Sequence, residues 1–339
     1  MSSGPAFRTD ASNTAADQAQ QIGFNHDGMH YFALGEGAQA SRKGLLVLNH
    51  EYVDITQIYP ASAGSPSAEQ VAKALAAHGV SVVQFELRAN KWRLVDSSYN
   101  RRITGSTPVI FSGPVDASHP AVAGSLPPEG TLNNCANGFT PWGTYLTCEE
   151  NWNQYFGTAS SGYTLSDDQA RHGVTKNSSL KWHESNPRFD LAANPDETNR
   201  FGWIVEIDPF DPNSTPVKRT ALGRFKHEGA TYAETAGVAV FYSGDDENSE
   251  YIYKFVGSAP WQELIAAGRS PLDEGTLYVA RFNDDGTGDA DAPSGMACGE
   301  PGVEHRVLHT HQRVRKPERC ESTWHQSVRL DHELERDRR

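Results

Sequence analysis

The chain has 339 residues, enough to bury a large hydrophobic core in one big domain or two small ones. Its formal net charge of -13 at pH 7 argues against a nucleic-acid partner, because phosphate backbones require a basic surface. The sequence has no run of about 18 apolar residues, so no membrane span is expected. The first residues lack the basic head and apolar stretch of a secretory signal, so we expect no signal peptide in this chain.

Short runs rich in Val, Ile, Tyr and Phe, separated by turn residues, predict an all-β fold. In chain order, the candidate strands are residues 45–48, 82–87, 93–96, 144–147, 202–207, 238–242, 251–256 and 277–282. Many short strands with long polar loops are typical of a barrel, a sandwich or a propeller, and no strict repeat period chooses among them.

Helix is expected at only a few places. The clearest helix follows Ser67, which forms a possible capping pair with Gln70, and it ends at His78 and Gly79. A shorter helix is predicted over residues 260–267. The polar residues 158–200, rich in Gly, Asn and Ser, indicate a long excursion on one face of the fold.

Four acidic clusters lie close to the predicted strands. Residues 148–151 (Cys-Glu-Glu-Asn) join a thiol to two carboxylates, a combination of soft and hard ligands that suits iron or zinc next to calcium. The other clusters are residues 49–52, 226–229 and 244–248. Because a β-scaffold can aim side chains at the ends of strands toward one centre, we expect these clusters to form a mixed-ligand metal site.

The candidate metal ligands are Glu51, Cys148, Glu149, Glu228, Asp245 and Asp246. Cys148 could instead be a buried thiol, or it could form a disulfide with Cys135. Glu149 and Glu150 cannot point the same way on an extended chain, because side chains alternate, and Glu149 is the preferred ligand.

The other candidates also have simpler interpretations. Glu51 could be a solvated carboxylate at the end of a strand, and Asp245 and Asp246 could belong to an ordinary hairpin turn. Lys226 and His227 are candidates for binding a substrate phosphate, through a point charge and a hydrogen bond, or they form a surface pair. The sequence has no Walker-type phosphate loop and no Gly-x-Ser-x-Gly motif, which argues against a serine nucleophile.

The order and spacing of several stretches resemble the PhoX family of bacterial alkaline phosphatases. The stretches are residues 23–29, 49–52, 140–151 and 199–209, supported by 223–230 and 251–256. The resemblance implies a β-propeller with its site at the central axis, and hydrolysis of small phosphate monoesters by a metal-dependent phosphatase. It also implies iron and calcium as cofactors, a periplasmic or secreted location, and catalytic roles for Cys148, Glu149 and Glu228.

The resemblance divides the chain into three parts. We expect a flexible N-terminus over residues 1–19, a PhoX-like propeller domain over 20–288, and a disordered or non-family tail over 289–339. The family would continue after residue 288 with further strands and an Arg-Pro-Glu-Trp motif, which the tail lacks. We therefore expect a truncated or frame-altered member with an incomplete propeller. The alternative functions are an inactive calcium-binding propeller fragment and a calcium-dependent propeller esterase or lactonase.

Overall fold

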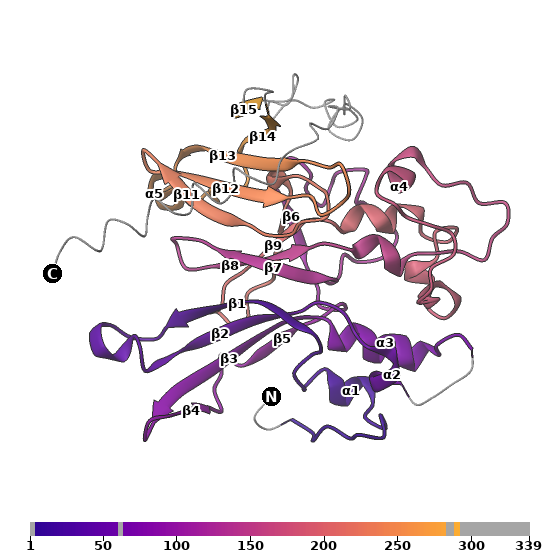
Figure 1. The fold of residues 1–339 in the computed structure, drawn as a ribbon, viewed down its shortest axis with the longest axis horizontal. Helices are drawn as coiled ribbons and strands as arrows, with labels where there is room; N and C mark the ends of the chain where they lie inside the picture. Colours follow the sequence, from indigo (N-terminus) through magenta and orange to yellow (C-terminus); the bar gives the residue numbers. More distant parts are fainter. Residues whose placement is uncertain (1–3, 60–63, 283–287, 292–339) are drawn as a thin grey trace.

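The computed structural model describes residues 4–59, 64–282 and 288–291 of the chain. Most of its regular structure lies in three five-stranded sheets, and most of the short helices, though not all, lie at one end of the sheets (Figure 1). The expected β-rich fold with few short helices is therefore confirmed. No helix of the described residues is both long and apolar enough to cross a membrane.

The first sheet is antiparallel throughout, with the order β1-β2-β3-β4, and β5 also pairs with β3. Its strands are β1 (His26–Ala33), β2 (Lys43–His50), β3 (Gly79–Arg88), β4 (Lys91–Leu94) and β5 (Arg101–Ile103). Leu45 and Val47 of β2 are fully buried and pack in one cluster with Val80 and Val82 of β3. This alternation in the central strands fixes their register, since a slip by one residue would turn the apolar side chains toward solvent.

The second sheet has the order β6-β10-β9-β8-β7. Its strands are β6 (Ile110–Ser112), β7 (Asn134–Phe139), β8 (Tyr145–Glu149), β9 (Ile204–Ile207) and β10 (Val217–Arg219). Only the pairing of β6 with β10 is parallel within this sheet. Every residue of β8 and β9 is buried, as expected for central strands covered on both faces.

The third sheet is an antiparallel meander in which each strand pairs with the next along the chain. Its strands are β11 (Thr231–Thr235), β12 (Val238–Gly244), β13 (Ile252–Pro260), β14 (Gly275–Phe282) and β15 (Gly288–Asp291). Residues 288–291 thus form a strand across the expected boundary between the propeller domain and the tail, and residues 292–339 lie outside the described part.

All eight predicted strand segments overlap strands of the structure, and both predicted helices are present. The first is α3 (Ala68–Ala77), in which Ser67 and Gln70 form the predicted reciprocal capping box and His78 is the C-cap. The second is α5 (Trp261–Ala266). The remaining helices are α1 (Ala15–Gln18), α2 (Ile55–Ile58) and α4 (Asp167–Arg171), with 3-10 turns η1 (Gly37–Gln39), η2 (Trp152–Tyr155), η3 (Trp182–Glu184), η4 (Pro187–Phe189), η5 (Pro195–Arg200) and η6 (Thr220–Leu222).

An aromatic core joins α3 to the polar excursion at residues 158–200. The excursion contributes the fully buried Trp182 and Phe189, which pack on Tyr155 and Phe156 of the preceding segment. Tyr155 and Trp182 have ring centroids 4.8 Å apart. Fully burying a large apolar side chain contributes about 1.5–3 kcal/mol, so these few rings hold a segment that is otherwise polar.

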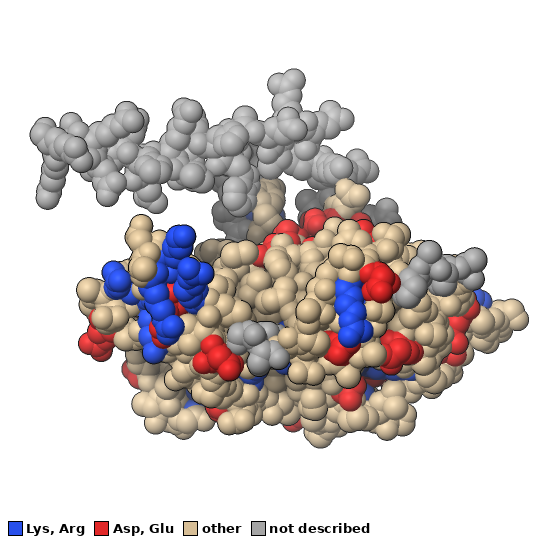
Figure 2. All heavy atoms as spheres, turned by 90° about the horizontal axis from the view of Figure 1, so that it is seen from below, with Lys and Arg blue, Asp and Glu red and all other residues tan. Residues whose placement is uncertain are grey.

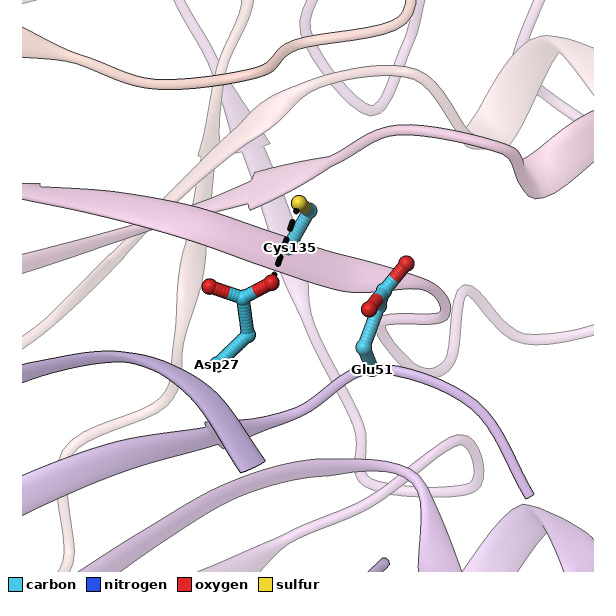
Figure 3. A group of neighbouring side chains, drawn as sticks. All are labelled: Asp27, Glu51 and Cys135. Carbon is cyan, nitrogen blue, oxygen red and sulfur yellow. Dashed lines mark hydrogen bonds between the residues drawn. The ribbon is translucent and has the colours of Figure 1, made fainter. Parts of the chain in front are cut away.

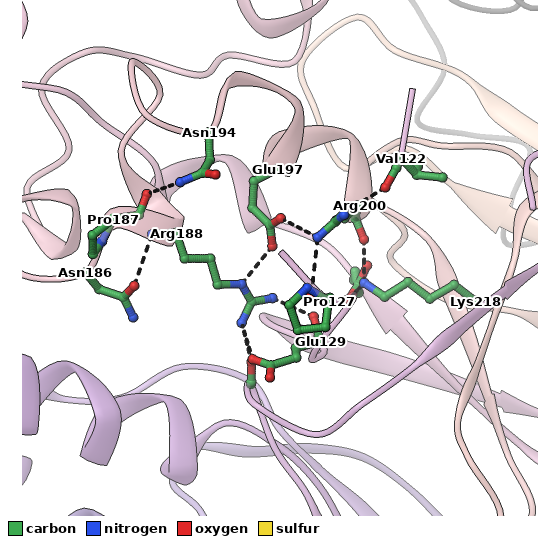
Figure 4. Close-up of polar contacts among 12 residues, drawn as sticks. Val122, Pro127, Glu129, Asn186, Pro187, Arg188, Asn194, Glu197, Arg200 and Lys218 are labelled. Carbon is green, nitrogen blue, oxygen red and sulfur yellow. Dashed lines mark hydrogen bonds and ion pairs between the residues drawn. The ribbon is translucent and has the colours of Figure 1, made fainter. Parts of the chain in front are cut away.

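A buried ionic network holds the same excursion against the second sheet (Figure 4). Glu197 accepts from Arg188 at 2.7 Å and from Arg200 at 2.9 Å, and all three side chains are at most 8% exposed. The network continues to Lys218 of β10, whose Nζ donates to the carbonyl oxygen of Arg200 at 2.6 Å and to Glu149 Oε1 at 2.8 Å. Lys218 and Glu149 are fully buried, so each neutralises the charge of the other.

Surface cations are concentrated at one end of the molecule on the face seen in Figure 2. Residues of β2, β3 and β4 bring them together, because Lys43 lies opposite Glu86, Glu86 opposite Arg93, and Arg88 opposite Lys91. Glu86 pairs with Arg88 and Lys43.

Lys218→Met tests the buried pair, because it leaves the Glu149 carboxylate in the core without its cation. Removing one partner of a buried ion pair typically costs about 3–5 kcal/mol, and we expect the free energy of unfolding in urea to fall by about this amount. The double variant Lys218→Met/Glu149→Gln should recover part of the loss. A loss below about 1 kcal/mol in the single variant would show that the pair is not the anchor described here.

Candidate metal centre

Three edge strands, β1, β7 and β11, lie next to one another, one from each sheet (Figure 1). Two glycines allow this approach. A Cβ atom at Gly138 of β7 would lie 1.9 Å from the carbonyl oxygen of Ala230, and one at Gly28 of β1 would lie 2.8 Å from the backbone of Asn137. Any larger residue at either position would push the strands apart, so glycine is required where the sheets meet.

The same placement of side chains recurs in every sheet. One residue comes from the start of the edge strand, or just before it, and one from the end of the neighbouring antiparallel strand, or just after it. The pairs are Asp27 with Glu51, Cys135 with Glu150, and Glu228 with Asp246. Because the edge strands converge, these ends bring five carboxylates and one thiol toward a shared space.

The first group consists of Asp27, Glu51 and Cys135, whose ligand atoms all lie within 4.8 Å of one another. Figure 3 shows the Asp27 and Glu51 side chains extending from the first sheet toward β7, the strand that carries Cys135. The Cys135 thiol donates to Asp27 Oδ2 at 3.3 Å. This group therefore combines two carboxylates and one sulfur from two sheets.

The second group consists of Cys135, Glu150 and Glu228, again within 4.8 Å. Cys135 Sγ lies 3.7 Å from both carboxylate oxygens of Glu228. Asn151 donates its side-chain amide to Glu150 Oε1. Because Cys135 belongs to both groups, its sulfur stands at their junction.

The carboxylates of the cluster repel one another. Burial, then the charges of Asp27 and Glu228, raise the pKa of Glu51 to about 6. Burial, a hydrogen bond with Asp246 and the charge of Glu228 raise the pKa of Glu150 to about 8. Burial and the Glu150 charge also raise the pKa of the Cys135 thiol.

In the part of the chain that the structure describes, these carboxylates have no side-chain cation as an ion-pair partner. Among residues 4–59, 64–282 and 288–291, no Lys or Arg forms an ion pair with the cluster carboxylates Asp27, Glu51, Glu150, Glu228 and Asp246. A charged carboxylate is costly to bury without a counter-ion, and a bound cation would relieve both the repulsion and the burial cost.

The cluster has a buried floor and an open rim. Cys135 is 8% exposed and Glu150 is 3% exposed, whereas Asp27, Glu228 and Asp246 are exposed. The donor set fits metal binding, because carboxylate oxygens suit calcium and a thiolate suits iron or zinc. Solvent or a small ligand would reach an ion bound by the buried Cys135 and Glu150 from the exposed side of the cluster.

Several predicted ligands lie in or beside the cluster. Glu51 and Glu228 each belong to one of the two groups, and Asp246 hydrogen-bonds with Glu150. Asp245 lies one residue further back, where its Oδ1 accepts from the backbone N–H of Lys226 at 3.2 Å. Burial raises the pKa of Asp245 to about 6.

Cys148 and Glu149 lie apart from these two groups. Cys148 is fully buried in an apolar cluster with Leu146 and Ile204. Neither Cys148 nor Cys135 forms a disulfide. Glu149 Oε1 accepts from Lys218, and its Oε2 accepts from the backbone N–H groups of Gly202 and Trp203 at 3.0 and 3.1 Å. The geometry thus brings Cys135 and Glu150 into the two groups in place of the predicted Cys148 and Glu149, because Glu149 faces the ionic network behind the sheet.

The predicted phosphate-binding pair is also occupied by other contacts. Lys226 Nζ donates to Glu247 Oε2 at 2.5 Å. His227 is fully buried, with Nδ1 2.8 Å from Ser243 Oγ and Nε2 3.0 Å from the carbonyl oxygen of Gly223. Burial lowers the pKa of His227 to about 3, so this ring is neutral and supports the local fold.

The sequence-based prediction missed Asp27, Cys135 and Glu150 as site residues. Asp27 lies in the stretch 23–29 that carries the family resemblance, and Glu150 lies beside the preferred Glu149. Cys135 follows two asparagines, where no acidic neighbour marks it. The alternation of side chains at residues 148–150 indicates that Glu149 and Glu150 lie on opposite faces of the strand, but it does not say which of the two faces meets the cluster.

Glu149→Gln and Glu150→Gln provide a matched pair for separating structure from metal binding. We expect Glu150→Gln to weaken Fe²⁺ binding by at least about tenfold, because it removes a charged oxygen donor from the second group, which also holds the Cys135 thiol. Glu149→Gln should mainly lower the free energy of unfolding, because its carboxylate faces Lys218. Isothermal titration and urea denaturation measure the two effects, and the reverse assignment would restore Glu149 as the ligand.

The metal-free protein should become less stable as the pH rises from 7.5 to 8.5. At the start of this range the folded state still holds most of the proton on Glu150, with its pKa of about 8, whereas the unfolded state, with a pKa of 4.5, has lost it. His78 and His227, with folded pKa values of about 4 and 3 against 6.5, are almost entirely neutral in both states there. Thermal unfolding with a chelator measures this slope, which Glu150→Gln should flatten; a slope unchanged in the variant would contradict the assignment.

Comparison with known proteins gives two matches. A family model described as alkaline phosphatase PhoX matches residues 1–322. A solved structure, Pseudomonas fluorescens PhoX in complex with vanadate, a transition state analogue, is 44% identical with a TM-score of 0.81. The match covers 90% of this chain and 57% of that chain, so this chain spans little more than half of its relative. A search of curated proteins finds no match. The chain belongs to the PhoX alkaline phosphatase family.

Proposed function

We propose that this chain holds iron and calcium in the cluster and hydrolyses small phosphate monoesters there. One observation carries the proposal: the described residues gather five carboxylates and a thiol without a Lys or Arg partner for any of the carboxylates. Such a group is strained by its own charge until cations bind, and groups with strongly raised pKa values are typical of functional sites. Membership of the family supports the same chemistry.

The donor types suggest how the ions would be held. Cys135 is the proposed iron ligand, because thiolates prefer soft or borderline metals, and it would act together with Glu150 and Glu228. Asp27 and Glu51 are hard oxygen donors that suit calcium, as is Asp246 beside them. Since Cys135 belongs to both groups, its sulfur is placed to hold neighbouring ions.

The bound cations would neutralise the ester oxygens and stabilise the leaving group, which the very slow hydrolysis of phosphate esters requires. The residues of the chain supply access and selectivity. The exposed rim at Asp27 and Glu228 admits a small ester, and the metal-free carboxylates would repel its phosphate. The vanadate complex of the P. fluorescens relative supports phosphoryl chemistry in the family.

We also propose that the three sheets are blades of a β-propeller whose inner strands are β1, β7 and β11. The recurrence of one residue at the start of each inner strand and one at the end of its neighbour supports this architecture. The cluster would then lie at the axis of the propeller. By the same family likeness, we propose a periplasmic or secreted location.

Calcium binding without turnover is the second candidate. The chain spans 57% of the relative solved with vanadate, and the rim carboxylates could bind calcium alone. A calcium-dependent esterase or lactonase is the third. Turnover of p-nitrophenyl acetate but not p-nitrophenyl phosphate would favour the third candidate, and calcium content without turnover of either would favour the second.

Cys135→Ser, compared with Cys148→Ala, tests the proposed enzyme directly. We expect the unmodified protein to contain iron and calcium and to release phosphate from p-nitrophenyl phosphate. Cys135→Ser should lose iron and at least about 100-fold in kcat/KM, since even outer-shell changes at metal sites cost about 10- to 100-fold. Cys148→Ala should keep its iron. Elemental analysis that finds iron in Cys135→Ser and none in Cys148→Ala would reverse the assignment.

A further inference from the structure

Asn49 occupies the joint between the first two sheets, just before the cluster. It is fully buried near the end of β2, two residues before Glu51. Its Nδ2 donates to the carbonyl oxygens of Cys135 at 2.5 Å and Ala136 at 3.1 Å. Its Oδ1 accepts from the hydroxyls of Tyr145 at 3.0 Å and Thr147 at 2.9 Å. The side-chain amide therefore uses both of its donors and both of its acceptor positions.

These partners fix the orientation of the amide. Two of them are backbone carbonyl oxygens, which can only accept, so the amide nitrogen must face β7. The other two are hydroxyls of β8, which can donate to the amide oxygen. A flipped amide would place oxygen against oxygen in a fully buried site, which is strongly unfavourable.

All four hydrogen bonds of the Asn49 side chain run from the first sheet to the second. Through them, Asn49 is linked to the backbone at or next to each residue of the first group. Cys135 is held through its own carbonyl oxygen. Glu51 follows Asn49 on the same strand end. Asp27 is reached through Tyr145, whose single hydroxyl hydrogen is shared between Asn49 Oδ1 at 3.0 Å and the carbonyl oxygen of Gly28 at 2.8 Å.

We infer that Asn49 is a positioning residue that fixes the separation between the Cys135 sulfur and the Asp27 and Glu51 carboxylates. The inference rests on the proposed metal-binding function. A metal site requires its ligands to be held within about 0.5 Å of the productive geometry. Because the two carboxylates and the sulfur come from different sheets, that tolerance depends on the joint between the sheets.

Asn49→Ala and Asn49→Asp test this inference with Co²⁺ as the probe. Cobalt bound by a thiolate gives a charge-transfer absorption band, so the band reports the sulfur and the titration reports the dissociation constant. Asn49→Asp keeps the shape but turns two donors into acceptors that face carbonyl oxygens. We expect both variants to raise the dissociation constant by about 10- to 100-fold and to weaken the band.

Asn100→Ala is the matched control for a purely structural loss. The Asn100 side chain also bridges backbone groups, accepting from the N–H of Gln84 at 2.8 Å and donating to the carbonyl oxygen of Val95 at 2.7 Å. It lies just before β5 of the first sheet, away from the cluster residues, so its variant should lose stability but keep the Co²⁺ dissociation constant and the band. All titrations are made well below the measured unfolding temperature of each variant.

The outcomes separate the inference from the function on which it rests. A wild-type protein without a thiolate band would contradict the proposed metal site itself. A wild-type band with an unchanged dissociation constant in both Asn49 variants would overturn the positioning role. If neither Asn49 variant folds, Thr147→Val removes one donor to Asn49 Oδ1 and Thr147→Ser restores it. Equal Co²⁺ binding by these two Thr147 variants would also overturn the inference.

Discussion

Mutual repulsion among carboxylates at the meeting point of three sheets is the constraint on which the rest of the structure depends. The cluster combines five carboxylates with a buried thiol, and burial raises the pKa values of Glu51, Glu150 and Cys135. Without cations this arrangement opposes folding, so other parts of the chain must hold the sheets together. The aromatic core around Trp182 and the ionic network around Glu197 supply that support on the helical side.

Two neighbouring glutamates show how environment assigns a role to identical chemistry. Glu149 is fully buried, paired with Lys218 and hydrogen-bonded to two backbone N–H groups, so its charge is satisfied. Glu150, one residue later, meets Asp246 and Glu228 and has a strongly raised pKa. The alternation of side chains at the end of β8 separates a residue that stabilises the fold from one that is available to a cation.

The strands that sequence patterns predicted and those that they missed differ in what they carry. β2, β3, β8 and β12 are rich in apolar residues, because their side chains fill the core, and their periodicity is readable. The edge strands β1, β7 and β11 were all missed. β1 and β7 contain Asp, Asn and Gly, which have low strand propensity, at the ends that meet at the cluster. The short strands β5, β6, β10 and β15 were missed as well. The fold is therefore least visible in the sequence where the proposed site lies.

The sequence by itself determined the family, the β-rich class, the capped helix α3 and the acidic segments that supply Glu51, Glu228 and Asp246. These follow from local composition, spacing and propensity. Only the tertiary structure decided that Cys135 and Glu150, rather than Cys148 and Glu149, face the cluster, and that Asp27 joins them. The physical reason is that glycines at positions 28 and 138 let separate sheets approach, and such contacts between distant segments leave no periodic trace in the chain.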